Sequence, residues 1–297
     1  MRFSKLLTWL IFSAACACLV GVGRSQQPAP ATRMAGRIVV AKVTGTVTAT
    51  NSADRTSRAL ATNDVIGQNY VISTAGASSA VLVFSNGATV NVGADSVLSI
   101  DEFLQDPFDQ AVKVSDLKEE PSTSTTRLNL TRGELVGNVK HLHQDKGSSF
   151  TVNTPVGAAG IRGTTFRIVF TPDASGKVTF SLQTADGQVL FTGTTNTQVK
   201  VDAGKQITAT VEVKVDPTTN TVTVTSQPTI TSTETLSAAD QVTIQTATQE
   251  AVEAAKTVIL QSTTKQGSTQ SSTPQDTDTT PPATPTSSNT TSLAGKH

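Results

Sequence analysis

Two histidines and an aspartate have a spacing that could bind a metal ion. His141, His143 and Asp145 alternate along a segment that resembles a β-strand, in which every second side chain projects from the same face. Imidazole and carboxylate groups bind zinc and other divalent ions when a fourth group or water completes the shell. The same alternation is typical of exposed polar positions on a strand, and the sequence has no further cluster of ligands. We therefore predict neither a metal site nor another cofactor.

The other patterns that could carry catalysis are missing from the sequence. It has no G-x-S-x-G nucleophile motif, no P-loop and no dinucleotide-binding glycine motif. Gly157, Gly160 and Gly163 recur at every third position, but they precede a predicted strand and not a helix whose N-terminus could bind phosphate. Glu119 and Glu120 fall in a predicted loop, where we expect no burial that would shift a pKa. We predict a non-enzymatic protein without catalytic residues.

Arg162 is the strongest candidate for a functional side chain. It belongs to the stretch 150–169, FTVNTPVGAAGIRGTTFRIV, in which a strand stops at Thr154-Pro155 and resumes at Thr164. We expect the small residues 157–160 to form a tight corner between these strands. The planar guanidinium could lock this corner by binding backbone carbonyls, or it could bind a partner's carboxylate. Either role predicts that Arg162→Lys is not neutral.

Short β-branched stretches with turn residues fill most of the chain. They predict an all-β fold, either a sandwich or a solenoid-like β-roll of short strands, with one C-terminal helix. Asn86-Gly87 predicts a type I′ hairpin, and residues 105–126 predict a long surface loop. Residues 172–226 add further strands, including a hairpin at 210–225, which could complete the same sheets or form a small separate one.

A helix is predicted for residues 237–260, with Ser237 as its N-cap. Its apolar stripe is narrow and rich in alanine, and consists of Ala239, Val242, Ala247, Ala251, Ala254, Val258 and Ile259. Residues 263–297 are rich in Ser, Thr and Pro and almost free of apolar side chains, so we expect a disordered tail.

The first 25 residues have the pattern of a signal peptide. Arg2 and Lys5 precede an apolar run from Leu6 to Val22, and Gly23-Arg24-Ser25 forms a small-residue cleavage site. An uncleaved anchor and lipidation at Cys16 remain the alternatives. After cleavage the chain would begin with a linker, 26–35, would contain no cysteine and would form no stable membrane span. It would hold 20 Lys+Arg against 23 Asp+Glu, which gives no footprint for nucleic acid.

Local charge is less even than the total. Residues 101–120 have a balance of −5, and residues 127–167 have a balance of +4. The acidic loop could simply lie across the basic strands, or the charges could form a docking face that controls encounter and specificity.

Several motifs in sequence order resemble the FecR domain, the periplasmic module of iron-citrate signalling regulators. The stretch TPVGAAGIRGTTF (154–166) is similar to its closing signature. Residues 64–76, 78–92 and LTRGELVG (130–137) are similar to its earlier strands, so the resemblance covers about 36–171. It implies that the following residues form a binding or structural signature: Thr154, Pro155, Gly157, Gly160, Arg162, Gly163 and Thr164.

The resemblance implies a binding role in the bacterial cell envelope. FecR-like proteins receive a signal from an outer-membrane transporter and control a sigma factor through a cytoplasmic segment. Only five residues precede the apolar run here, so we expect no such segment and no sigma-factor control by this chain alone. We expect an exported protein-binding or signal-relay module, in the periplasm or at the cell surface, whose partner is a transporter or a membrane regulator. The alternative is a structural envelope scaffold or a surface-polymer-binding protein.

Overall fold

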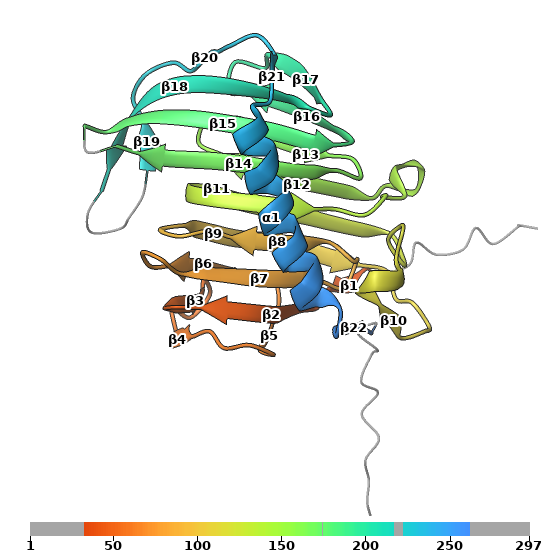
Figure 1. Ribbon diagram of the computed structural model, residues 1–297. Helices are drawn as coiled ribbons and strands as arrows, with labels where there is room; N and C mark the ends of the chain where they lie inside the picture. The colour runs from red at the N-terminus through yellow and green to blue at the C-terminus, as the bar shows by residue number, and fades with distance from the viewer. Residues whose placement is uncertain (1–32, 174, 217–221, 262–297) are drawn as a thin grey trace, which may run out of the picture. The chain divides into compact units, whose positions relative to one another are not determined.

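The computed structural model describes residues 33–173, 175–216 and 222–261, and these residues form a two-sheet β-sandwich with one long helix (Figure 1). The strands of the first sheet lie in the order β4 (Ser57–Ala59), β3 (Val47–Asn51), β6 (Tyr70–Thr74), β9 (Val97–Gln105), the first part of β11 (Ser124–Asn138), β12 (Ser149–Thr154), β13 (Gly157–Ile161), β16 (Gln188–Gly193) and β17 (Gln198–Asp202), and β1 (Met34–Ala35) pairs with β9.

The second sheet faces the first. Its strands lie in the order β5 (Val65–Ile66), β2 (Ile38–Thr44), β7 (Ser79–Phe84), β8 (Thr89–Val92), the second part of β11, β14 (Thr165–Pro172), β15 (Lys177–Asp186) and β18 (Lys205–Val215), with β19 (Val222–Val224), β20 (Thr229–Ile230) and β21 (Glu234–Thr235) beside β18. Among the described strands only β11 pairs in both sheets, so the two sheets share one strand. The predicted all-β class is confirmed.

One apolar core fills the space between the sheets. Along β12 and β14 every second residue is buried up to Phe170, which is the period expected of strands with one face on a core. Phe84 packs edge-to-face on Phe103, with ring centroids 5.1 Å apart, and also contacts Phe150. The same core continues from Ile38 to Val213. The strands after residue 171 therefore complete the two sheets, which answers the question that the sequence left open.

Strand β11 passes from one sheet to the other at Gly133. Residues up to Arg132 pair with β9, and residues from Gly133 onward pair with β14 and β8. Gly133 has φ +98°, and a Cβ there would lie 2.4 Å from the Ser96 Cα. The Ser96 hydroxyl accepts a hydrogen bond from the Glu134 backbone N–H at 2.9 Å, which fixes the crossing point. Only glycine fits this corner.

Two local predictions differ from the structure. In the β7–β8 hairpin only Gly87 has a positive φ, and the Gly87 N–H donates to the Phe84 carbonyl, so this is a type I turn closed by a left-handed glycine and not a type I′ turn. The predicted surface loop 105–126 is also shorter and more ordered than expected. It contains β10 (Val112–Lys113) and the 3-10 helix η1 (Val114–Asp116), and β11 has begun by Ser124. Residues 106–123 otherwise connect β9 to β11 as a loop, so most of the predicted loop is present.

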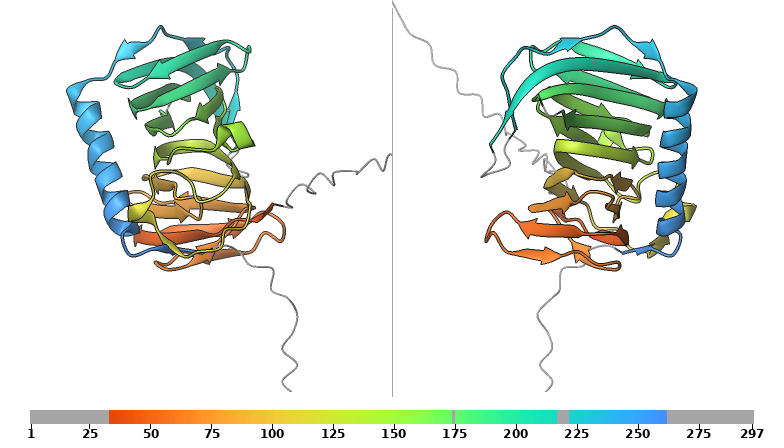
Figure 2. Two further views of the ribbon diagram at one scale, coloured as in Figure 1. Left: turned by 90° about the vertical axis from the view of Figure 1, so that its right-hand side faces the viewer. Right: turned by 60° about the vertical axis from the view of Figure 1, so that its left-hand side comes forward.

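The helix α1 (Ala238–Ala255) crosses the outer face of the second sheet and contacts β2, β7, β8, β11 and β14 (Figures 1 and 2). The Ser237 hydroxyl accepts from the Asp240 backbone N–H, as an N-cap should, and its own hydrogen bond to the Asp240 carboxylate lowers the pKa of that group. Arg167 and Lys42 bind Asp240 and Glu250 near its two ends. After the helix, β22 (Ile259–Leu260) pairs with β10.

The buried stripe of α1 differs from the predicted one. Ile244, Ala251 and Ala255 are buried, whereas the predicted Val242 and Ile259 are 60% and 53% exposed. Ala251 and Val258 of the predicted stripe are buried, but Ile244 was not part of it, because the many alanines leave the direction of the stripe ambiguous. No helix among the described residues is long and apolar enough to cross a membrane. The predicted signal peptide (1–25), most of the predicted linker 26–35 and the predicted tail (263–297) lie outside the described residues; Met34–Ala35, at the linker's end, form β1.

The crossing at Gly133 predicts a large effect of one methyl group. Gly133→Ala should lower the free energy of unfolding by about 2–4 kcal/mol, because alanine is strained at this φ and its Cβ overlaps Ser96. Gly204→Ala is the matched control, since Gly204 has φ +73° with nothing within 4 Å, and should cost only about 1 kcal/mol. Urea denaturation measures both, and equal losses would refute the proposed clash.

The corrected helix stripe is tested by a second pair of variants. Ile244→Ala should lower the free energy of unfolding by about 2–5 kcal/mol, because the side chain is fully buried against Val136 and Leu236. Val242→Ala should change it by less than about 0.5 kcal/mol. Thermal unfolding followed by circular dichroism distinguishes the two, and a larger loss for Val242 would restore the predicted stripe.

Candidate functional site

The predicted signature folds as a hairpin followed by a turn. Strands β12 and β13 are antiparallel, with Thr154 opposite Gly157, so Pro155 and Val156 form the hairpin turn. Residues 157–161 are a strand and not the predicted small-residue corner. Gly157 is required there, because a Cβ would lie 2.5 Å from the Thr192 carbonyl oxygen of β16. Gly160 meets only the Leu190 carbonyl at 3.6 Å, so the structure does not require glycine at that position.

The Arg162–Gly163 turn is held by Thr164, which is buried. The Thr164 hydroxyl donates to the Gln188 carbonyl oxygen at 2.9 Å and accepts from the Arg162 backbone N–H at 3.3 Å. Gly163 has φ +62°, and a Cβ there would lie 3.2 Å from the Cα of His141. Gly187 packs even more closely against the Gly163 turn, because a Cβ added at Gly187 would lie 2.5 Å from the Gly163 carbonyl oxygen. These glycines allow neighbouring turns to pack backbone against backbone.

Four connections therefore lie side by side at one edge of the sandwich. We call them the loop edge, which consists of residues 106–123, 139–148, 162–163 and 186–187. The 139–148 connection is joined to the first by hydrogen bonds between the Glu120 N–H and the His141 carbonyl (3.0 Å) and between the His141 N–H and the Lys118 carbonyl (3.3 Å). The Val139 N–H donates to the Thr164 carbonyl at 3.0 Å on its other side. The connections thus form one hydrogen-bonded surface.

Arg162 is exposed on the loop edge. Within the part of the chain that the structure describes, its guanidinium has no hydrogen bond or ion pair; only its backbone N–H is bonded. The predicted role of locking the corner through backbone carbonyls is therefore not observed, and Thr164 holds the turn instead. The second predicted role, binding a carboxylate of a partner, is the one that the geometry permits.

The three residues considered as metal ligands are separated by the fold. The segment from His141 to Asp145 is not a strand, because His141 forms a single bridge to Glu119 and Gln144–Lys146 forms the 3-10 helix η2. His141 and Asp145 line the hollow beside Arg162, whereas His143 lines a different hollow. In the described residues no group of three or more His, Cys, Asp or Glu side chains could hold a metal ion.

Glu120 is a residue whose burial the sequence did not predict. It was expected in an exposed loop, but it is 1% exposed. Its carboxylate accepts hydrogen bonds from the His143 backbone N–H at 2.7 Å and from the Ser124 hydroxyl at 2.6 Å. The His143 ring Nε2 lies 3.1 Å from the Glu120 carbonyl oxygen. A buried carboxylate without a cationic partner depends on such donors.

The network around Glu120 continues into the sandwich. The Asn86 side-chain amide donates to the hydroxyl oxygens of Ser124 (3.1 Å) and Thr126 (3.3 Å). The Ser148 hydroxyl oxygen accepts from the Ser124 N–H at 3.1 Å. These groups come from β7–β8, β11 and the 139–148 connection, so the network ties the loop edge to the strands below it. No local sequence pattern could have identified these partners, because they are distant along the chain.

The charges at the loop edge are only partly neutralised. Asp106 pairs with Arg33 at 3.7 Å, and Glu102 pairs with Arg127 on the adjacent strand. Lys140 is half-buried, and this burial lowers the pKa of its ammonium group. Asp109, Asp116 and Glu119 have no ion pair among the described residues. The acidic loop is thus partly paired with basic residues and partly available to a partner.

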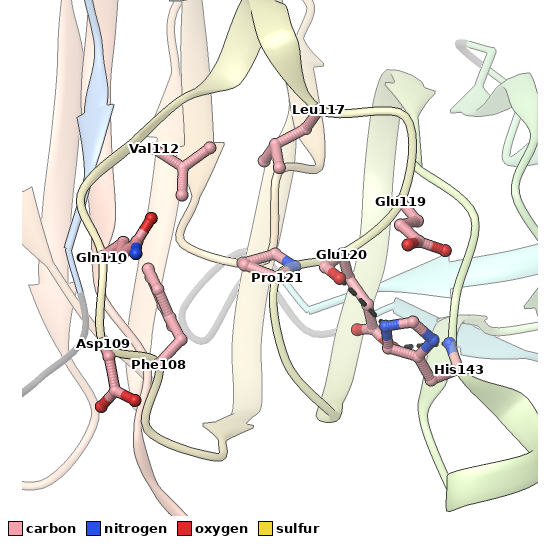
Figure 3. A pocket seen from close by; sticks show the side chains of 9 residues that line it. All are labelled: Phe108, Asp109, Gln110, Val112, Leu117, Glu119, Glu120, Pro121 and His143. Atoms are coloured by element: carbon pink, nitrogen blue, oxygen red, sulfur yellow. Dashed lines mark hydrogen bonds between the residues drawn. The ribbon is translucent and has the colours of Figure 1, made fainter.

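Two hollows open on the loop edge. The Arg162 hollow has a volume of about 530 Å³ and is lined by His141, Leu142, Gln144, Asp145, Arg162, Gly187 and Gln188. The Phe108 hollow has a volume of about 470 Å³ and is lined by Phe108, Asp109, Gln110, Val112, Leu117, Glu119, Glu120, Pro121 and His143 (Figure 3). The connection 139–148 contributes to both, so the hollows are neighbours.

Part of the chain matches a known protein family. Residues 70–190 match the family described as FecR protein. This segment is similar to the FecR domain. The loop edge lies entirely within the matched segment, whereas the sandwich extends beyond this segment at both ends, through β2 and β18.

Two crystal structures are similar to part of the chain. Both are of a protein provisionally described as an anti-sigma factor from Parabacteroides distasonis ATCC 8503. They are 14% identical to this chain, with TM-scores of 0.33 and 0.34, and each match covers 53% of this chain and 59% of the solved one. No curated protein matches the chain significantly.

The role of Glu120 predicts different effects for two substitutions. Glu120→Leu should lower the free energy of unfolding by about 2–3 kcal/mol, because it leaves the His143 N–H and the Ser124 hydroxyl without their acceptor. Glu120→Gln should cost less than about 1 kcal/mol, since its amide oxygen can accept from His143 while its NH₂ donates to Ser124. Chemical denaturation of both variants provides the comparison. A larger loss for Gln would show that the negative charge itself stabilises the loop edge.

Proposed function

We propose that this chain is an exported, non-enzymatic protein-binding module of the bacterial cell envelope that relays a signal, and that its FecR domain binds its partner through the loop edge. The apolar run after Arg2 and Lys5 supports export, to the periplasm or the cell surface. The FecR match supports the signalling part of the proposal, with a transporter or a membrane regulator as the class of partner.

The observation that carries the proposal is the state of Arg162. A five-donor guanidinium on a rigid turn, exposed and unpaired in the described part of the chain, is ready to bind a carboxylate in a bidentate manner. The backbone of the turn is fixed by the buried Thr164 and by Gly163, so binding orders the Arg162 side chain but costs little backbone entropy. Binding at such a site requires no movement of the sandwich.

The experiment is crosslinking in the native cells, followed by purification of this chain and identification of the attached molecules. Recovery of an envelope protein with the wild-type chain, and a loss of about tenfold or more with Arg162→Glu, is the expected result, since one buried charge-assisted pair is worth about 1.5–3 kcal/mol. Arg162→Lys should give an intermediate loss, because lysine retains the charge without the planar fork.

Arg55→Glu is the matched control. Arg55 is an exposed arginine in the turn between β3 and β4, it has no ion pair among the described residues, and the substitution makes the same change in charge. Capture should be unchanged by this variant. Equal capture by wild type and Arg162→Glu would refute the proposal, and recovery of polysaccharide or peptidoglycan in place of a protein would favour the envelope scaffold.

A further inference from the structure

We infer that the Phe108 hollow binds an apolar side chain of the partner that is flanked by basic residues. This inference rests on the proposed function, because it assigns a chemistry to one part of the same protein-binding surface. It concerns residues that are distinct from Arg162, so the two assignments can be tested separately.

The hollow has an apolar wall that the fold holds in place. Phe108 and Leu117 line it and also pack, half-buried, on a second apolar cluster that contains Val83, Val114, Ala255, Val258 and Leu260. The next wall residue, Val112, pairs with Leu260 of β22. The C-terminal end of α1 and the strand that follows it therefore support the loop from behind. A supported apolar hollow can bind a side chain without first ordering a mobile loop.

The opposite wall of the hollow is polar and equally fixed. Figure 3 shows Glu120, Pro121 and His143 facing the Phe108 side of the hollow. The Glu120 carboxylate is occupied by the His143 N–H and the Ser124 hydroxyl, and the His143 ring lies against the Glu120 carbonyl. These groups already have partners, so the wall defines the shape of the hollow and leaves the binding of charge to the residues at its rim.

Negative charge at the rim of the Phe108 hollow favours basic residues on either side of the partner's apolar side chain. Asp109 and Glu119 line the hollow, are exposed, and have no hydrogen bond or ion pair for their carboxylates within the described residues. The two lysines of the same loop, Lys113 and Lys118, are exposed but do not line the hollow. A partner's side chain that enters the hollow therefore lies near two carboxylates, Asp109 and Glu119, that have no cationic partner in the described residues. An apolar residue flanked by lysine or arginine is the segment that complements both features.

The two hollows together would orient the partner. Arg162 favours an acidic group in its hollow, which Asp145 also lines, whereas the rim of the Phe108 hollow favours basic groups. Residues 141–143 contribute to both hollows. A partner bound in the reverse orientation would place like charges together, which is unfavourable. The surface thus distinguishes the direction of a bound segment as well as its composition.

The first test uses purified protein and fluorescent peptides. The probes are short peptides with a central leucine or phenylalanine flanked by lysines, and matched peptides in which glutamates or serines replace the lysines. Fluorescence anisotropy should show binding of the lysine-flanked peptides that weakens at higher salt. The double variant Asp109→Lys/Glu119→Lys should weaken this binding by about tenfold or more, in line with two exposed ion pairs replaced by like charges.

The control is Asp116→Lys, which changes the charge of the same loop at an exposed carboxylate that does not line the hollow. It should leave the affinity within about twofold of the wild type, because its carboxylate is not one of those at the rim and a single exposed charge outside the contact contributes little. Equal binding of the glutamate-flanked peptides, equal effects of Asp116→Lys and the double variant, or no binding of the lysine-flanked peptides would each overturn the inference.

The same double variant is then compared with Arg162→Glu in the crosslinking experiment. Loss of the captured protein in both variants, with the control Asp116→Lys unchanged, would support both assignments. Loss with Arg162→Glu alone would leave the proposed function in place and overturn the inference about the Phe108 hollow. Capture of a protein by every variant would overturn both, because neither site would then lie at the interface.

Discussion

The structure depends on the point at which β11 changes sheets. The strand can pair with β9 on one side of the sandwich and with β14 on the other only because Gly133 bends without a side chain, against the backbone of Ser96. Hydrogen bonds from this corner reach Glu134, and the Thr74 hydroxyl oxygen accepts from the Ser96 N–H at 2.9 Å. The two halves of the sandwich therefore share one core, and no separate interface has to hold them together.

The loop edge is held in place by β11 and by the close packing of its neighbouring turns. β11 continues directly into the 139–148 connection, and Gly163 and Gly187 allow the adjacent turns to pack on it at backbone distance. The buried Glu120 then joins the long loop to the same connection. The side chains at this edge are therefore held on hydrogen-bonded turns and on a loop that Glu120 anchors, and in the proposed binding role this would favour specificity for shape and charge over adaptability.

The sequence predicted best those features that depend only on residues close together in the chain. Alternating apolar residues identified the strands of the core, and Ser237 identified the start of α1, because period and capping are local properties. It was least informative where the answer depended on distant partners. The burial of Glu120, the unpaired state of Arg162 and the separation of His141 from His143 all arise from contacts between connections far apart in the chain. The small residues 157–160 were misjudged for the same reason, since β16 pairs with them and makes them a strand.

The helix that crosses the second sheet has a consequence for how the molecule unfolds. A stack of strand pairs in which each pair contacts mainly its neighbours can lose its outer layers one at a time. α1 contacts strands from β2 to β14 and, through β22, also the loop between β9 and β11. It acts as a brace along the stack, so that fraying of one layer also disturbs contacts several layers away. We therefore expect α1 to couple openings of separate layers into one cooperative unfolding transition.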